Sequence, residues 1–155
     1  MIIFHKQKNI LTVLILALLL LQEVNAETVP SIQMTVSSNK VAVGSEIEFK
    51  IGVSAINPIN AFDITLVHSP ELLEFVSART DNSIASIWQS FPLQDINGKL
   101  RLVGGMTSAY SGENGEIISL IFKAKAKGNA ELTVERADLA LADGKGTLLS
   151  GGMGR

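Results

Sequence analysis

Regular alternation of apolar and polar side chains over residues 44–78 is the feature that most constrains this fold. In the segment GSEIEFKIGVSAINPINAFDITLVHSPELLEFVSA, apolar residues take every second position of two successive runs. They are Ile47, Phe49, Ile51 and Val53, followed by Phe62, Ile64 and Leu66. Because side chains of a β-strand alternate between the two faces of a sheet, the pattern predicts strands with one buried and one exposed face. A sandwich or barrel of such strands keeps an outer surface free for recognition.

The first 26 residues have the organisation of an export signal. Basic residues precede an apolar run at 10–21, and the small residues at 24–26 form a cleavage site. As a helix the run would span roughly 18 Å, well short of the roughly 30 Å hydrocarbon core of a bilayer. We therefore expect a cleaved signal peptide at 1–26, one domain at 27–150 and a flexible tail at 151–155. The expected location is secreted or at the cell surface, with no membrane span after cleavage.

Charge and cysteine content narrow the classes of partner and of fold. Without residues 1–26 the chain carries 11 basic and 14 acidic side chains, a formal charge of −3. Nucleic acids and anionic membranes are disfavoured as partners, since phosphate binding needs clustered Lys and Arg. The chain has no cysteine, so an exported form must rest on its hydrophobic core without disulfides. A single domain of about 120 residues buries roughly two-thirds of its unfolded surface and can do so.

The remaining chain predicts more strands and no helix of ten residues after residue 26. Asn97-Gly98 is a strong hairpin signal. The segment from Gly104 to Gly115, with four glycines among polar residues, predicts a loop. Strands separated by turns at intervals of about 8–12 residues are typical of an all-β antiparallel sandwich. Further strands are expected at 31–37, 72–78, 99–103, 116–126 and 130–135, with a last pairing at 138–142.

Three segments resemble the cohesin domain, the jelly-roll sandwich module of cellulosome scaffold proteins and related cell-surface proteins. AFDITLVHSPELLEFVSA at 61–78 is similar to a cohesin strand with Phe-Asp, followed by Tyr-Asp-Pro and Leu-Glu-Val-Val. GEIISLIFKAKAKGNAELTV at 115–134 is similar to the late strands around a glycine turn, and ADLALADGKGTLL to the closing segment. The similarity covers roughly residues 31–149. It implies an antiparallel jelly-roll β-sandwich, an architecture that resembles carbohydrate-binding modules too.

The resemblance also implies a way of binding. Cohesins hold a dockerin, a small calcium-loaded helical module of a partner protein, on the outer face of one sheet. Asp63 matches an aspartate that many cohesins use to accept hydrogen bonds from the partner. Ala61 stands where asparagine is frequent, and His68-Ser69-Pro70 replaces Tyr-Asp-Pro. The implied partner-binding residues are Asp63, Thr65, Val67, Arg101 and Val103.

Two alternative functions follow from other residues. Trp88 and Tyr110 lie in segments without clean alternation, and a flat row of aromatic rings would stack on sugar rings of a polysaccharide. A lone tryptophan beside Ile84 and Ile87 equally predicts a core residue, because its large apolar area favours burial. The second alternative is a structural spacer of a surface assembly with no separable ligand.

No residue set predicts catalysis or a bound cofactor. His68 is the only histidine after residue 26, and its chain neighbour Ser69 points away from it in a continuing strand. A metal centre of His or Cys ligands lacks its residues. The turn around Asp143 lacks the spaced acidic ligands of a calcium loop. We therefore expect a non-catalytic protein without a metal or cofactor.

Overall fold

The computed structural model describes residues 30–91, 97–150 and 152–153, and every regular element in them is a strand. This confirms the all-β prediction. In the described part of the chain there is no helix of the length and apolarity needed to cross a membrane. The predicted signal peptide lies outside the described residues. The strands are β1 Ser31–Val36, β2 Glu46–His68, β3 Leu73–Arg79, β4 Ile87–Ser90, β5 Lys99–Ala124, β6 Leu132–Leu141, β7 Leu148–Ser150 and β8 Gly152–Met153.

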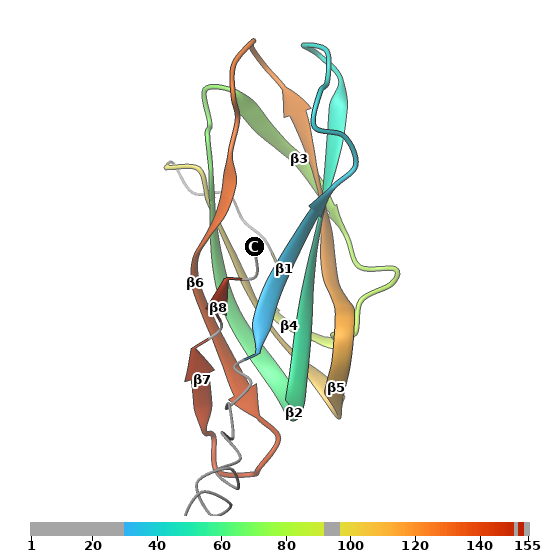
Figure 1. Ribbon diagram of the computed structural model, residues 1–155, viewed down its shortest axis with the longest axis vertical. Coiled ribbons are helices and arrows are strands. Elements are labelled where there is room, and N and C mark those ends of the chain that lie inside the picture. The colour runs from blue at the N-terminus through green and yellow to red at the C-terminus, as the bar shows by residue number, and fades with distance from the viewer. Residues whose placement is uncertain (1–29, 92–96, 151, 154–155) are drawn as a thin grey trace, which may run out of the picture.

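One long antiparallel ribbon of β2 and β5 organises the molecule. The two strands pair from Glu46 opposite Lys123 to Val67 opposite Lys99. Register shifts lie between Ile51 and Ala61, in the part of the ribbon that turns back on itself at one end of the molecule (Figure 1). Extra residues in one strand of a pair bend the ribbon and increase its twist. The bend therefore places the two halves of the ribbon in different layers.

Each half of the ribbon pairs with its own neighbouring strands. The first half of β2 pairs with β1 and the second half of β5 with β3, which completes one layer. The second half of β2 pairs with β6, the first half of β5 with β4, and β6 with β7. All of these pairings are antiparallel, and only the short β8 runs parallel to its neighbour β1. The result is a sandwich of two layers that share both of their central strands.

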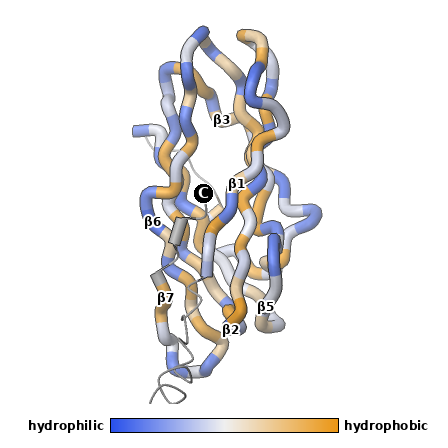
Figure 2. Tube along the Cα trace, in the orientation of Figure 1, coloured by the Kyte–Doolittle hydropathy of each residue, from blue (hydrophilic) through white to orange (hydrophobic). Residues whose placement is uncertain are grey.

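The core lies between the layers and contains the residues that the alternation predicts. Hydropathy alternates along the strands, as Figure 2 shows. Phe122, which is fully buried, makes edge-to-face ring contacts with Phe49, Phe75 and His68 at centroid distances of 5.6, 5.6 and 5.0 Å. Phe49 is half-buried and packs against the same cluster. The other predicted core residues are buried: Ile47, Ile51, Phe62, Ile64, Leu66 and Leu120.

The predicted loop from Gly104 to Gly115 is wrong, because β5 runs through it without a break. The glycines serve the bend and the packing of the ribbon instead. A Cβ on Gly104 would lie 2.7 Å from the Phe62 ring, and one on Gly115 would lie 2.5 Å from the Tyr110 ring. Glycine leaves room for those rings at no steric expense. A glycine-rich composition therefore marks close packing here.

Two further expected segments contain strands. The strands expected at 130–135 and 138–142 are one strand, β6, with a register shift between its pairs with Thr65 and Leu66. The expected tail at 151–155 contains β8, whose Gly152 and Met153 pair with Ser31 and Ile32.

Candidate binding face

The outer face of the β6-β2-β5-β4 layer carries the residues that the sequence predicts for partner binding. Along β2, Phe62, Ile64 and Leu66 are buried, whereas Asp63 and Thr65 between them are half-buried. This is the outcome of strand alternation over a packed core. The side chains of Asp63 and Thr65 therefore point away from the core.

Strand register brings the predicted residues of β2 and β5 together. Asp63 lies opposite Val103, Thr65 opposite Arg101, and Val67 opposite Lys99. Opposed residues on one face have Cβ atoms about 4.5–5.5 Å apart, so these residues are close neighbours across the strands. Asp63, Thr65, Val67, Arg101 and Val103 thus form one continuous patch.

Arg101 and Asp63 form a bidentate ion pair on this patch. Arg101 donates from Nε to Oδ1 at 3.0 Å and from Nη2 to Oδ2 at 2.6 Å. The hydrogen bond from Arg101 is the main reason that the pKa of Asp63 lies below its usual value of 3.8, and the positive charge of Arg136 adds to it. Asp63 is therefore a carboxylate at neutral pH whose oxygens are already engaged.

A second ion pair, which sequence reasoning missed, lies beside the first. Asp138 of β6 is directly opposite Asp63, and Arg136 of the same strand donates to Asp138. Arg101 and Arg136 both lie opposite Thr65, one on each side of β2. Both arginine side chains are 61% exposed, against 23% for Asp63 and 17% for Asp138. The outermost charge of this cluster is therefore positive.

An apolar row crosses the same face. Leu148 of β7 lies opposite Ala140, Ala140 opposite Ala61, Ala61 opposite Gly105, and Gly105 opposite Ile87 of β4. The three central residues are small, and the two outer ones are aliphatic and exposed by 64% at Leu148 and 55% at Ile87. No local sequence signal predicts this row, because its members come from five strands.

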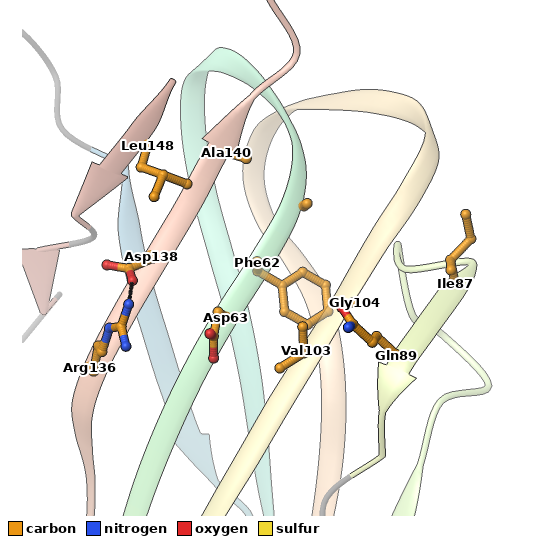
Figure 3. A pocket seen from close by; sticks show the side chains of 11 residues that line it. Phe62, Asp63, Ile87, Gln89, Val103, Gly104, Arg136, Asp138, Ala140 and Leu148 are labelled. Atoms are coloured by element: carbon orange, nitrogen blue, oxygen red, sulfur yellow. Dashed lines mark hydrogen bonds and ion pairs between the residues drawn. The ribbon is translucent and has the colours of Figure 1, made fainter. Parts of the chain in front are cut away.

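Four residues of the row, Leu148, Ala140, Ala61 and Ile87, line a shallow groove of about 340 Å³. Its remaining lining includes Asp63, Val103, Arg136 and Asp138. Figure 3 shows the groove with Leu148 at one side and Ile87 at the other, and with the Arg136–Asp138 contact along its border. The groove therefore combines an apolar floor with one charged edge.

The aromatic residues proposed for sugar binding lie apart. Trp88 is half-buried and packs edge-on against Phe62 and Phe91, at centroid distances of 5.5 and 5.4 Å. Tyr110 lies over the ribbon bend, where its hydroxyl donates to the Glu113 carbonyl at 3.1 Å. No ring contact joins Trp88 to Tyr110 among the interactions of the described residues. Carbohydrate binding through these residues stays a prediction.

His68 and Asp143, which were considered for catalysis and metal binding, make contacts that belong to the core and to a turn. His68 is 3% exposed and its ring lies against Phe122. Asp143 accepts hydrogen bonds from the Lys145 amide and the Thr147 hydroxyl, as in a side-chain-stabilised turn. Within the described residues, no group of three His, Cys, Asp or Glu side chains could hold a metal ion.

Known structures share this fold. A cohesin module from a family 33 glycoside hydrolase of Clostridium perfringens is 14% identical with a TM-score of 0.68, covering 79% of this chain and 90% of that one. The sixth cohesin of Acetivibrio cellulolyticus scaffoldin B, solved in complex with a Cel5 dockerin, is 14% identical with a TM-score of 0.63, covering 80% and 94%. The cohesin of a type I cohesin–dockerin complex from Clostridium thermocellum is 10% identical with a TM-score of 0.64, covering 80% and 89%.

Comparison with curated proteins gives no match. The family model of the cohesin domain matches residues 32–151, which is most of the chain. The jelly-roll sandwich that the sequence resemblance implies is thereby confirmed. On the family match and the shared fold together, this chain belongs to the cohesin domain family.

Proposed function

We propose that this chain is an exported, non-catalytic module that binds a partner protein of the dockerin type on its β6-β2-β5-β4 face. Family membership supports protein binding in general, and two of the similar cohesins were solved with a dockerin bound. The partner and the face are inferences for this chain. Export rests on the predicted signal peptide at 1–26.

The observation that carries the proposal is the groove on that face. Its apolar floor lies beside two ion pairs, on a sheet whose other side is the buried core. A concave apolar surface with polar groups at its border is the usual form of a recognition site. Because the backbone of the face is hydrogen-bonded within the sheet, the surface is held rigid before binding. Preorganisation of this kind lowers the entropy lost on association.

The test measures binding of calcium-loaded dockerin modules by calorimetry, starting with the dockerins of the two complexes named above. The variant Asp63→Arg/Val103→Asp reverses one charge and places another in the apolar part of the patch. The control, Thr35→Arg/Val36→Asp, introduces the same two residue types at exposed positions of β1. We expect the face variant to weaken binding by at least about tenfold and the control by less than about twofold.

Equal binding by the face variant and wild type would show that the face is wrong. Circular dichroism of each variant verifies that the sandwich is intact. Export is checked separately by mass spectrometry of the secreted protein, whose first residue should be Glu27.

A further inference from the structure

We infer that the opposite face of the sandwich, on the β1-β2-β5-β3 layer, holds a second binding site for a neutral polyhydroxylated ligand such as a sugar chain. This site is independent of the proposed function, because it lies on another layer and takes another class of ligand. Its residues include neither Trp88 nor Tyr110.

The β1-β2-β5-β3 face has a depression that only polar residues line. Its volume is about 230 Å³, enough for one sugar ring. The lining residues are Glu48 and Lys50 of β2, Glu116 and Ser119 of β5, Arg79 of β3, and Asp81 and Asn82 of the loop that follows β3. Ile47, Phe49 and Ile51 alternate with the two β2 residues and pack in the core instead.

Strand register brings the lining residues into one row across the face. Thr35 lies opposite Lys50, Lys50 opposite Ser119, and Ser119 opposite Arg79. Four strands at about 4.8 Å spacing make this row roughly 14 Å long. A ligand of more than one ring can therefore follow it.

A smaller depression of about 100 Å³ adjoins the first, and Lys50 and Glu116 line both. The Lys50 Nζ and Glu116 Oε2 atoms are 3.5 Å apart, so one ion pair borders the two depressions. Gln33, Thr35 and Asn114 add three uncharged polar side chains to the smaller one. Together the two depressions offer places for successive rings of one chain.

The carboxylates of the larger depression are recessed below its cations. The side chains of Glu48 and Glu116 are 26% and 19% exposed, against 56% for Arg79 and 47% for Lys50. Burial raises the pKa of Glu48, but hydrogen bonds from Arg79 and Ser119 outweigh it, and the pKa lies below 4.5. Glu48 is therefore ionised at neutral pH. The floor offers hydrogen-bond acceptors and the rim offers donors.

Ser119 is a buried hydroxyl group in that floor. It is 3% exposed and interrupts the apolar run from Ile117 to Phe122. Its Oγ donates to Glu116 Oε1 at 3.1 Å and is also a hydrogen-bond partner of Glu48. A hydroxyl has one hydrogen to donate, so one of the two carboxylates always lacks it. That carboxylate can accept a hydrogen bond from a ligand hydroxyl.

Asp81 and Asn82 supply further polar groups at the rim. Both are exposed, and within the described residues neither side chain has a hydrogen-bond or ion-pair partner. The Asn82 carboxamide donates and accepts, and the Asp81 carboxylate accepts. Neighbouring hydroxyls of a sugar also donate and accept, so they match this mixture of groups.

The lining excludes other classes of ligand. Three carboxylates against two cations leave a formal charge of −1, which does not attract phosphate groups. The larger depression has no apolar lining on which the anchor residue of a protein partner could be buried. Within the described residues no set of acidic or histidine side chains could hold a metal ion. A neutral polyol needs none of these features.

The test is an NMR titration of the protein with cellotetraose, xylotetraose and mannotetraose, and with tetragalacturonate as an anionic comparison. At least one neutral chain should shift the amide signals of Lys50, Arg79, Asn82 and Glu116. Its Kd should be on the order of 1 mM, because the site buries little apolar area and each hydrogen bond adds little net free energy. No shift with any neutral chain, shifts confined to other residues, or tighter binding of tetragalacturonate would overturn the inference.

Variants test the rim. Asp81→Ala/Asn82→Ala removes two side chains without partners in the described fold, and it should weaken the bound tetrasaccharide by at least about fivefold. Asn129→Ala/Glu131→Ala, on the exposed loop before β6, removes an amide and an acidic side chain elsewhere and should stay within about twofold of wild type. Equal affinities of the two variants would refute the site.

Failure of this site is distinguishable from failure of the proposed function. Asp63→Arg/Val103→Asp should leave tetrasaccharide binding unchanged, and Asp81→Ala/Asn82→Ala should leave dockerin binding unchanged. Loss of tetrasaccharide binding in Asp63→Arg/Val103→Asp would place the sugar on the β6-β2-β5-β4 face and overturn the inference.

Discussion

Arg101 holds the carboxylate of Asp63 with two hydrogen bonds from a neighbouring strand, at 3.0 and 2.6 Å. Arg101 lies opposite Thr65 and not opposite Asp63. Its side chain therefore extends along the sheet, from the level of Thr65 to that of Asp63, to bring the guanidinium group to the carboxylate. Bidentate geometry of this kind fixes both side chains more firmly than a single contact would. Arg101 therefore fixes the orientation of Asp63, and both residues belong to the predicted patch.

The first prediction concerns pH. The folded-state pKa of Asp63 lies below 3.8, so its ionisation stabilises the fold above the unfolded pKa and ceases to do so as pH falls through the folded pKa. Arg101→Gln should bring the pKa of Asp63 closer to 3.8 and slightly lower the urea midpoint at pH 7. The midpoints of variant and wild type should converge once Asp63 is protonated in both. A difference that persists undiminished at the acid end would contradict this pairing.

The second prediction concerns the core. Phe122→Ala removes a fully buried ring that contacts Phe49, Phe75 and His68, so we expect a loss of about 3–5 kcal/mol in the free energy of unfolding. Urea denaturation followed by Trp88 fluorescence measures it. Val76→Ala, at a 45% exposed position, is the control and should change stability by less than about 0.5 kcal/mol. An unchanged midpoint for Phe122→Ala would refute the core assignment.

The third prediction concerns the corrected glycine segment. A methyl group at Gly104 would lie 2.7 Å from the Phe62 ring and 2.8 Å from the backbone carbonyl of Ile87. Because that carbonyl belongs to the paired strand β4, relief requires a shift of the backbone, and Gly104→Ala should cost about 1–3 kcal/mol. Ser108→Ala on an exposed position of the same strand should be nearly neutral. Equal stability of the two variants in thermal unfolding would mean that no close packing exists at Gly104.

The fourth prediction concerns the turn after β6. Hydrogen bonds from the Thr147 hydroxyl, and next from the Lys145 amide, hold the pKa of Asp143 below 3.8. Thr147→Ala should therefore raise the pKa of Asp143 toward that value. Carbon-detected NMR titration of the Asp143 carboxyl measures it, with Thr133→Ala on the exposed side of β6 as a control. A Thr147→Ala titration identical to wild type would disprove the hydrogen bond.

The local alternation of apolar and polar residues predicted those strands that have one buried face and one exposed face. The alternation from Ile47 to Leu66 is visible because one face of β2 is buried and the other is exposed to solvent. The structure buries these apolar residues in the core, except Phe49, which is half-buried and packs against it. The same logic failed between Gly104 and Gly115. There, composition indicates a loop, but pairing with β2 keeps the segment extended through the bend.

The amino-acid sequence by itself determined the all-β class, the inward set of core residues and the outward position of Asp63 and Thr65. These depend on the two-residue period of a strand, which is a local property of the chain. Only the tertiary structure decided where the ribbon bends, which residues lie opposite one another, and that Leu148, Ala140, Ala61, Gly105 and Ile87 form a row. The physical reason is that register is set by hydrogen bonds between strands far apart in the chain, and no single segment records its partner.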